Sequence, residues 1–277
     1  MSKILQHRKA LCNQLRRVAI GAGEITLKYF DDLGHKDVEA KKDGSPVTIA
    51  DQEAETFIEK ALAEMAPDVP MIGEEAVAAG RIPDITSSEY SWRVDALDGT
   101  REFIRGGSDF TVNIALIYKG DPVLGVVYAP EKGELYAGYI DENGESEAIK
   151  WLEETDHEKS IHVRKVPKGG VTIVASKSHG SAEKLESFLS DYKVEKLLKC
   201  GSSLKICVIA AGKADIYPRF GPTCEWDTAA ADAVLRAAGG VVTDTQGRAL
   251  RYVGADPKFL NPEFICWSEK QPDLKPL

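Results

Sequence analysis

The residues whose types and spacing are best suited to catalysis or metal binding form the short segment Asp-Ala-Leu-Asp-Gly-Thr at positions 95–100. It stands where a strand-like apolar run ends and a helix-like run begins, so two carboxylates three residues apart can point at one place. The backbone amides of Gly99 and Thr100 offer an anion site beside them. Carboxylates that can bind a cation would then lie next to backbone amides that can bind a phosphate. By itself the segment equally fits a simple turn, because Asp-Gly is a common turn dipeptide.

Three further acidic features stand at the ends of expected elements. Glu74 and Glu75 directly follow a short apolar run, which places them at a strand end. Asp227 opens an alanine-rich helical run, where the alternative role is that of a helix N-cap. Asp51 follows Thr48 by three residues near the start of a helical run, and that spacing also fits a capping box. Each feature therefore has a structural reading beside the functional one.

All of these candidate ligands offer oxygen, and no His or Cys stands at zinc spacing. Oxygen ligands favour Mg²⁺ or a similar hard cation, and Mg²⁺ is commonly completed by substrate phosphate. We therefore predict a phosphate ester substrate. No Walker A or G-x-S-x-G string occurs, and the histidines show no nucleophile and base pattern, so a covalent mechanism is poorly supported. Cys224, close to Asp227, is interpreted as a packed small residue.

Composition excludes several classes of protein. The 277 residues include 35 basic and 44 acidic side chains, a net charge of -9 without any basic block, which argues against a nucleic acid polymer as partner. No apolar stretch approaches the ~18 residues of a membrane span. The five cysteines form no C-x-x-C pair, and the first residues lack the apolar core of a secretory signal. These features predict a reduced, cytoplasmic protein and leave peripheral membrane contact open.

The elements that must position these residues show two different patterns of expected secondary structure along the chain. Helical spacing predicts amphipathic helices over 11–29 and 54–65. Apolar runs separated by turn residues predict antiparallel strands at 110–118, 122–129 and 134–140. We therefore predict an α+β half, residues 1–150, that carries most of the metal ligands.

The expected pattern of strands and helices changes after the polar, acidic segment 141–159. We interpret this segment as the boundary between two halves or as an exposed insertion. Over 171–244 strands alternate with helices, which is typical of an α/β arrangement with a sheet covered on both faces. We predict an α/β half, residues 151–277, that carries Asp227 and the substrate-binding residues.

In combination, the acidic motifs resemble those of the lithium-sensitive, magnesium-dependent phosphatases of the inositol monophosphatase superfamily. The motifs are Asp51, Gly-Glu-Glu at 73–75, the segment 95–100 and Trp-Asp-Thr-Ala-Ala at 226–230. The runs 110–130, 174–179, 201–230 and 232–240 resemble the 3'(2'),5'-bisphosphate nucleotidases of the CysQ type within it. Two positions depart from the usual pattern: Ala96 replaces a more rigid turn residue, and Ala231 replaces a glycine. Neither change removes a ligand.

The resemblance implies a layered α-β-α-β-α sandwich with the site between the two halves. It implies two or three Mg²⁺ ions, with Asp95 bridging two of them. The residues it assigns to the metals are Glu74, Asp95, the carbonyl of Leu97, Asp98 and Asp227. Thr100, hydrogen-bonded to Asp51, would orient and deprotonate a metal-bound water, and Glu75 or Glu74 would help to hold a third, looser ion.

The choice of phosphate ester depends on Arg219. Inositol monophosphatases typically carry an acidic residue at the aligned position, where it binds a sugar hydroxyl, whereas a guanidinium suits bidentate phosphate recognition. Besides the metal-site residues Glu74, Leu97, Asp98, Gly99, Thr100 and Asp227, the implied substrate contacts are Ser176, His179, Ser202, Lys205 and Arg219. Lys205 and Arg219 would hold a second phosphate that is not cleaved. The alternative for these two side chains is ordinary solvated charge.

We therefore predict removal of the 3'-phosphate from adenosine 3',5'-bisphosphate, giving AMP and phosphate, with the 5'-phosphosulfate analogue as a related substrate. This reaction would clear a by-product of sulfur metabolism. An inositol monophosphatase or a sugar bisphosphatase is the enzymatic alternative. A non-catalytic metal-binding or nucleotide-binding module is the alternative of a different class.

Overall fold

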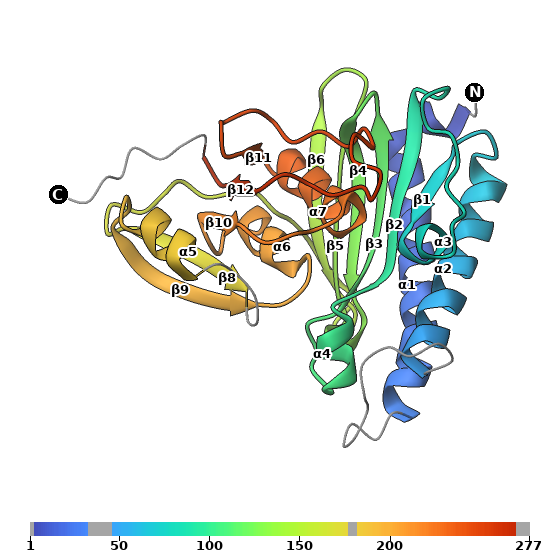
Figure 1. Cartoon of the computed structure of the whole chain (residues 1–277), viewed down its shortest axis with the longest axis horizontal. Coiled ribbons are helices and arrows are strands. Elements are labelled where there is room, and N and C mark those ends of the chain that lie inside the picture. The colour runs from blue at the N-terminus through green and yellow to red at the C-terminus, as the bar shows by residue number, and fades with distance from the viewer. Residues whose placement is uncertain (1–2, 33–45, 177–181, 270–277) are drawn as a thin grey trace.

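The computed structural model describes residues 3–32, 46–176 and 182–269, and its helices and sheets are stacked in layers (Figure 1). Helices α1 and α2 cover one face of the first sheet, α6 and α7 lie between the two sheets, and α5 packs on the outer face of the second. This order confirms the predicted α-β-α-β-α sandwich. The helices are α1 (Arg8–Asp32), α2 (Pro46–Met65), α3 (Glu74–Ala78), α4 (Thr100–Ile104), α5 (Ala182–Leu189), α6 (Leu204–Ala210) and α7 (Glu225–Ala237), with short 3-10 turns at Lys3–Gln6 and Pro130–Lys132.

The first sheet has seven strands that follow one another in chain order. Strands β1 and β2 are parallel, and each later neighbour is antiparallel. The strands are β1 (Met71–Gly73), β2 (Tyr90–Asp98), β3 (Thr111–Tyr118), β4 (Asp121–Ala129), β5 (Glu134–Ile140), β6 (Ser146–Leu152) and β7 (His157–Ser160). The predicted meander is therefore confirmed, and it is longer than expected.

The interpretation of the segment 141–159 as an exposed insertion is wrong, because the segment contains all of β6 and most of β7. Its polar composition reflects its place at the end of the sheet, where β7 is exposed along its whole length. An outer strand of this kind needs no continuous apolar pattern. Strand β6 also crosses residue 150, and the division of the chain into two halves stays a prediction.

The second sheet is mixed. Strand β8 is parallel to both β9 and β10, whereas β12 is antiparallel to β10 and to β11. The strands are β8 (Val171–Ser176), β9 (Val194–Cys200), β10 (Ile216–Arg219), β11 (Val241–Asp244) and β12 (Phe264–Trp267). The predicted alternation of strands and helices is confirmed. Strand β12 was missed, because a four-residue apolar run gives no readable periodicity.

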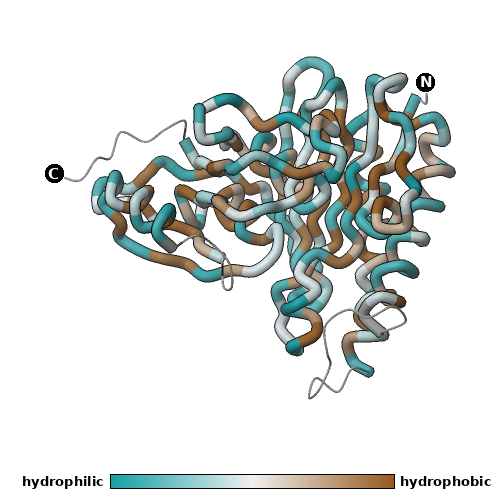
Figure 2. Tube along the Cα trace, in the orientation of Figure 1, coloured by the Kyte–Doolittle hydropathy of each residue, from teal (hydrophilic) through white to brown (hydrophobic). Residues whose placement is uncertain are grey.

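Helix α7 packs unusually close to the first sheet. A Cβ atom added to Gly125 of β4 would lie 2.0 Å from the carbonyl oxygen of Ala230, and one at Gly138 of β5 would meet the Ala237 side chain at 2.9 Å. Ala231, where the resemblance expects glycine, is fully buried. Figure 2 shows hydrophobic residues concentrated along the central strands and hydrophilic residues on the outer turns. This close approach fixes the start of α7, and with it Asp227, near the end of β2.

Within the described residues, none of the helices combines the length and the apolar character that a membrane crossing requires.

Candidate active site

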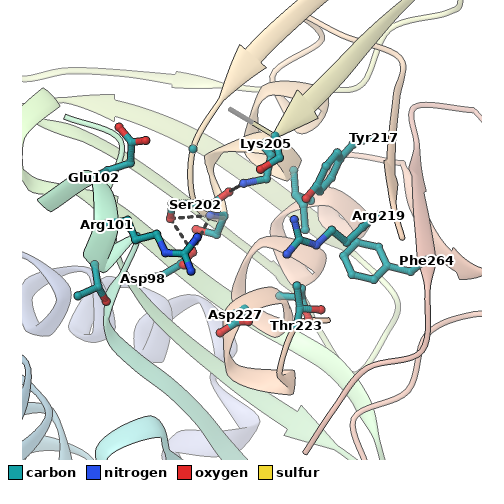
Figure 3. A pocket seen from close by; sticks show the side chains of 17 residues that line it. Asp98, Arg101, Glu102, Ser202, Lys205, Tyr217, Arg219, Thr223, Asp227 and Phe264 are labelled. Atoms are coloured by element: carbon teal, nitrogen blue, oxygen red, sulfur yellow. Dashed lines mark hydrogen bonds between the residues drawn. The ribbon is translucent and has the colours of Figure 1, made fainter. Parts of the chain in front are cut away.

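A cleft of about 320 Å³ opens where the end of β2 meets α6, α7 and the second sheet. Figure 3 shows its lining side chains converging on one space. Eight of the sequence-predicted residues line it: Asp98, Gly99, Thr100, Ser176, Ser202, Lys205, Arg219 and Asp227. Sequence reasoning did not select several other lining residues, among them Arg101, Glu102, Tyr217, Thr223 and Phe264. His179, also predicted to bind substrate, lies outside the described residues.

An irregularity at the end of β2 lets its two carboxylates serve one site. Side chains three residues apart on a regular strand point to opposite faces. Asp95 pairs with Asn113 of β3 and Asp98 with Thr111, so β2 carries one more residue than its partner between these points. A bulge of this kind turns the strand locally. It allows Asp95 and Asp98 to approach one metal site.

The backbone beyond Asp95 is shaped by hydrogen bonds within the segment itself. Asp95 Oδ1 accepts a bond from the Leu97 amide at 3.0 Å, and the Thr100 hydroxyl donates to the Leu97 carbonyl at 3.4 Å. Gly99 has φ of 97°, a left-handed conformation that favours glycine, and precedes α4 as its N-cap residue. The turn reading of the segment is thus correct as well, because the turn presents the ligands. The expected bond between Thr100 and Asp51 stays a prediction.

Two overlapping groups of carboxylates have the spacing of a metal site. Oxygen atoms of Glu74, Asp95 and Asp227 all lie within 4.8 Å of one another, and so do those of Asp51, Glu74 and Glu75. Glu74 belongs to both groups. The Oδ2 atom of Asp95 is buried and has no hydrogen-bond partner among the residues that the structure describes. An orphaned buried oxygen beside other carboxylates fits a divalent cation with oxygen ligands.

Burial and mutual repulsion shape the electrostatics of this cluster. Burial raises the pKa of Asp95 well above its ordinary value, and the negative charges of Glu74 and Asp98 raise it further. Burial and the charge of Asp98 also raise the pKa of Asp227, to about 8. Without a cation, ionising all of these groups at once is therefore unfavourable.

Asp227 combines a structural role with a functional one. The helix N-cap is Cys224, and Asp227 is the third residue of α7. Its Oδ2 accepts a bond from the Cys224 amide at 2.8 Å, which holds the carboxylate at the cleft. The thiol of Cys224 does not act as a thiolate at neutral pH, because burial raises its pKa to about 12. This agrees with the interpretation of Cys224 as a packing residue.

The capping-box reading of Asp51 does not hold. Helix α2 already begins at Pro46, so Thr48 lies inside its first turn rather than before it. Asp51 is fully buried on this helix and faces Glu74 and Glu75. Its place in the carboxylate cluster therefore explains its position better than helix capping does.

Glu55 supports the cluster from behind, and sequence reasoning missed it. Its carboxylate accepts bonds from the amides of Glu75 at 2.9 Å and Ala76 at 2.7 Å, at the start of α3. A Cβ atom added to Gly73 would lie 2.6 Å from the carboxylate carbon of Glu55. Burial raises the pKa of Glu55 to about 7. The available signal was its spacing of four residues from Asp51, which puts both on one helix face.

The opposite side of the cleft is formed by the loop before α6 and by β10. Asp98 Oδ2 accepts bonds from the Ser202 hydroxyl at 2.6 Å and from the Ser203 amide at 2.8 Å. Lys205 is only 8% exposed, and its ammonium group donates to the Ser202 carbonyl at 2.6 Å. These contacts join the metal-ligand strand to the substrate side of the cleft.

Two cationic side chains on this side, Lys205 and Arg219, have further hydrogen-bond donors beyond those that bond the backbone. Burial lowers the pKa of Lys205, and the charge of Asp98 opposes that shift. The Arg219 guanidinium donates to the carbonyls of Gly221 at 3.2 Å and Pro222 at 3.0 Å and points into the cleft in Figure 3. Arg101 reaches into the same space from α4. The burial of Lys205 contradicts the alternative of ordinary solvated charge for this residue, whereas substrate binding by Lys205 and Arg219 stays a prediction.

The fold places carboxylates with the spacing of a metal site beside cationic side chains between two sheets, and comparison with known proteins identifies the family of the chain. The family model described as "Inositol monophosphatase family" matches residues 8–273, and the chain belongs to that family.

Within the family, the chain is similar over most of its length to bisphosphate nucleotidases. It is 42% identical to the 3'(2'),5'-bisphosphate nucleotidase CysQ of Escherichia coli over 254 residues, which cover 92% of this chain and 98% of the relative. Among solved structures, CysQ from Bacteroides thetaiotaomicron superposes with a TM-score of 0.75 at 35% identity, covering 95% of this chain and 98% of that one. An inositol monophosphatase from Zymomonas mobilis superposes with a TM-score of 0.74 at 25% identity, covering 94% and 93%.

Proposed function

We propose that the chain is a metal-dependent 3'(2'),5'-bisphosphate nucleotidase that removes the 3'-phosphate from adenosine 3',5'-bisphosphate, giving AMP and phosphate. The observation that carries the proposal is a cleft lined by Asp98 and Asp227 together with Lys205 and Arg219, which the carboxylate cluster adjoins at Asp227. The carboxylates suit a metal-assisted hydrolysis, and the two cationic side chains suit a substrate with another phosphate. The 42% identity to a CysQ nucleotidase supports the same substrate class.

Glu74, Asp95, Asp98, Asp227 and the Leu97 carbonyl are the residues that would hold Mg²⁺, two or three ions in all. Bound there, Mg²⁺ would neutralise phosphate charge and lower the pKa of a water molecule. Support for this assignment comes from the spacing of three of the carboxylates and from the unpartnered Asp95 oxygen.

The chain's own residues would orient the attacking water. Thr100 lies at the cleft and is already turned toward the Leu97 carbonyl. We assign to its hydroxyl the task of accepting a proton from water and passing it toward Asp51, with Glu75 placing a further ion. The amides of Gly99 and Thr100 would contact the phosphate that is cleaved.

Lys205 and Arg219 would bind the phosphate that is not cleaved, together with Ser176 and Ser202. A charge-assisted, bidentate contact to Arg219 both strengthens and orients binding. The same cations make a hydroxyl-rich, singly phosphorylated substrate such as inositol monophosphate a poorer match. A purely metal-binding or nucleotide-binding module is disfavoured, because Thr100 lines the same cleft as the proposed metal ligands Asp98 and Asp227.

The test is a panel of phosphate-release assays in Mg²⁺ with adenosine 3',5'-bisphosphate, inositol 1-phosphate and fructose 1,6-bisphosphate. We expect kcat/KM to be highest for the bisphosphate nucleotide by at least tenfold. A preference for either of the other two substrates would replace the proposed function by the corresponding alternative, and no turnover of any would support a binding module.

A further inference from the structure

A buried ion pair joins the two elements that carry the metal ligands. Arg93 of β2 is completely buried and Glu225, the first residue of α7, is 4% exposed. The Arg93 Nε atom lies 2.6 Å from Glu225 Oε2. Neither residue lines the cleft or belongs to the carboxylate groups described above. Stability alone does not explain an ion pair this deeply buried, because a protein with an apolar pair of similar volume at the same place is often equally stable.

The pair is held by further hydrogen bonds on both sides. The Arg93 guanidinium also donates to the Ser91 hydroxyl at 2.9 Å, to the Trp92 carbonyl at 3.1 Å and to the Tyr252 carbonyl at 3.3 Å. The second oxygen of Glu225 accepts a bond from the Gly254 amide at 2.8 Å. The pair thus fixes β2, the start of α7 and the loop at 252–254 in one arrangement.

Each partner of the pair stands two residues before a carboxylate of the cluster in the chain. Arg93 precedes Asp95 by two residues, so their side chains share a face of β2. Glu225 precedes Asp227 by two residues within the first turn of α7. Oxygen atoms of Asp95 and Asp227 lie within 4.8 Å of each other, although like charges favour a larger separation. An attraction next to that repulsion would hold the two carboxylates together.

We propose that Arg93 and Glu225 are positioning residues that set the separation of Asp95 and Asp227 for metal binding. The pair touches no substrate; it acts through the two ligands. The proposal rests on the proposed function for its kinetic consequences, whereas its central claim concerns Mg²⁺ affinity and is measured without substrate.

The primary variants are Glu225→Gln, which removes the charge, and Glu225→Asp, which keeps the charge but shortens the side chain by one methylene. The second variant leaves Arg93 with a charged partner, so it remains informative if Glu225→Gln fails to fold. The matched control is Asp215→Asn. Asp215 is also fully buried and pairs with Arg164 at 2.7 Å, but it supports β8 and β10 and lies outside the cleft lining.

Mg²⁺ binding is measured by isothermal titration calorimetry on the full chain, and kinetics are measured with adenosine 3',5'-bisphosphate at varied Mg²⁺. We expect both Glu225 variants to raise the Kd and the half-saturating concentration of Mg²⁺ at least tenfold. KM for the nucleotide at saturating Mg²⁺ should change less than threefold. Asp215→Asn should lower Tm comparably and leave the Kd for Mg²⁺ within twofold of wild type.

Either of two results would overturn the positioning role. One is a Mg²⁺ Kd within twofold of wild type in folded Glu225→Asp. The other is an equal rise in Kd in Asp215→Asn, which would reduce the pair to general structural support. If wild type binds Mg²⁺ but does not hydrolyse the nucleotide, the proposed function fails while the positioning claim is still decided by calorimetry. If wild type binds no Mg²⁺, both proposals fall.

Discussion

The two sides of the cleft face opposite electrostatic problems. On the acidic side, burial and mutual repulsion raise the pKa values of Asp95 and Asp227, so the carboxylates are poorly satisfied without a cation. On the basic side, Lys205 and Arg219 already donate to backbone carbonyls and keep donors for an anion. Burial also disfavours the charge of Lys205, whose pKa it lowers, but the charge of Asp98 opposes that shift. The acidic side is therefore under the greater electrostatic strain, which a bound metal would relieve, whereas the donors of the basic side are prepared in advance.

This contrast indicates that the two sides of the cleft have different functions. The strained side would supply the chemistry, because a bound cation relieves repulsion there and acts on the phosphate. The prepared side would supply selection, because fixed donors discriminate between ligands with one and two phosphates. Changes on the acidic side should therefore alter catalysis for every substrate, and changes on the basic side should alter the choice among substrates.

The largest effect is expected from Asp95→Asn. Removing this charge from the carboxylate cluster should lower phosphate release from adenosine 3',5'-bisphosphate by about a thousandfold or more, the order expected when a central electrostatic group is lost. In the metal-free protein the same change relieves repulsion, and Asn still accepts the Leu97 amide. We expect its Tm in EDTA to equal or exceed that of wild type, while the Tm increase on adding Mg²⁺ should disappear.

A folded Asp95→Asn protein that retains more than a tenth of wild-type activity would contradict the metal assignment. Asp98→Asn is the companion test, since it is nearly isosteric and removes the charge of another proposed metal ligand. It should also lower activity by orders of magnitude, with an unchanged circular dichroism spectrum.

Arg219→Met should produce a selective loss. A charge-assisted contact contributes about 1.5–3 kcal/mol, or roughly ten- to a hundredfold in kcat/KM. The bisphosphate nucleotide should lose this factor, whereas a 3'-monophosphate or inositol monophosphate should lose little. Measuring both substrates in both proteins gives a ratio of ratios that cancels general damage to folding. A ratio near one would remove Arg219 from substrate selection and favour the inositol monophosphatase alternative.

The pH dependence of stability should report the strain on the acidic side. Asp227 binds its proton more tightly in the folded protein, where its pKa is about 8, than in the unfolded chain, where it is about 4. Its stabilising contribution is therefore complete below about pH 4 and is lost as the pH rises toward 8. In EDTA, the fall in Tm from pH 5 to pH 8 should be about 3–6 °C smaller in Asp227→Asn than in wild type. Parallel profiles would show that the cluster is not strained.

The smallest effect is expected from Cys224→Ser, although Cys224 adjoins the acidic side. Burial raises the pKa of the thiol to about 12, and the bond that the Asp227 carboxylate accepts comes from the backbone amide of this residue, which the substitution keeps. Serine is also a favourable N-cap residue. Activity should stay within about twofold of wild type in the same phosphate-release assay. A loss of tenfold or more would reopen a role for the thiol.

The sequence alone determined the kind of chemistry and most of the elements. Residue type is sufficient to predict oxygen ligands for a hard cation rather than the His and Cys ligands typical of zinc. The order of the motifs from Asp51 to Asp227 is also readable without coordinates. Periodicity located the helices α1 and α2 and the central strands, because long amphipathic patterns need no tertiary context. It failed for the polar segment 141–159 and for β12, where the pattern at the edge or in a short strand depends on neighbours.

Only the tertiary structure decided how the ligands meet. The bulge that turns Asp95 and Asp98 toward one site is visible only in the register of β2 against β3. The approach of Asp227 depends on α7 packing against Gly125, and the support of α3 by Glu55 depends on contacts between separate elements. Such contacts join residues far apart in the chain. Local sequence patterns therefore name the groups that do the chemistry, whereas long-range packing fixes the distances at which they can do it.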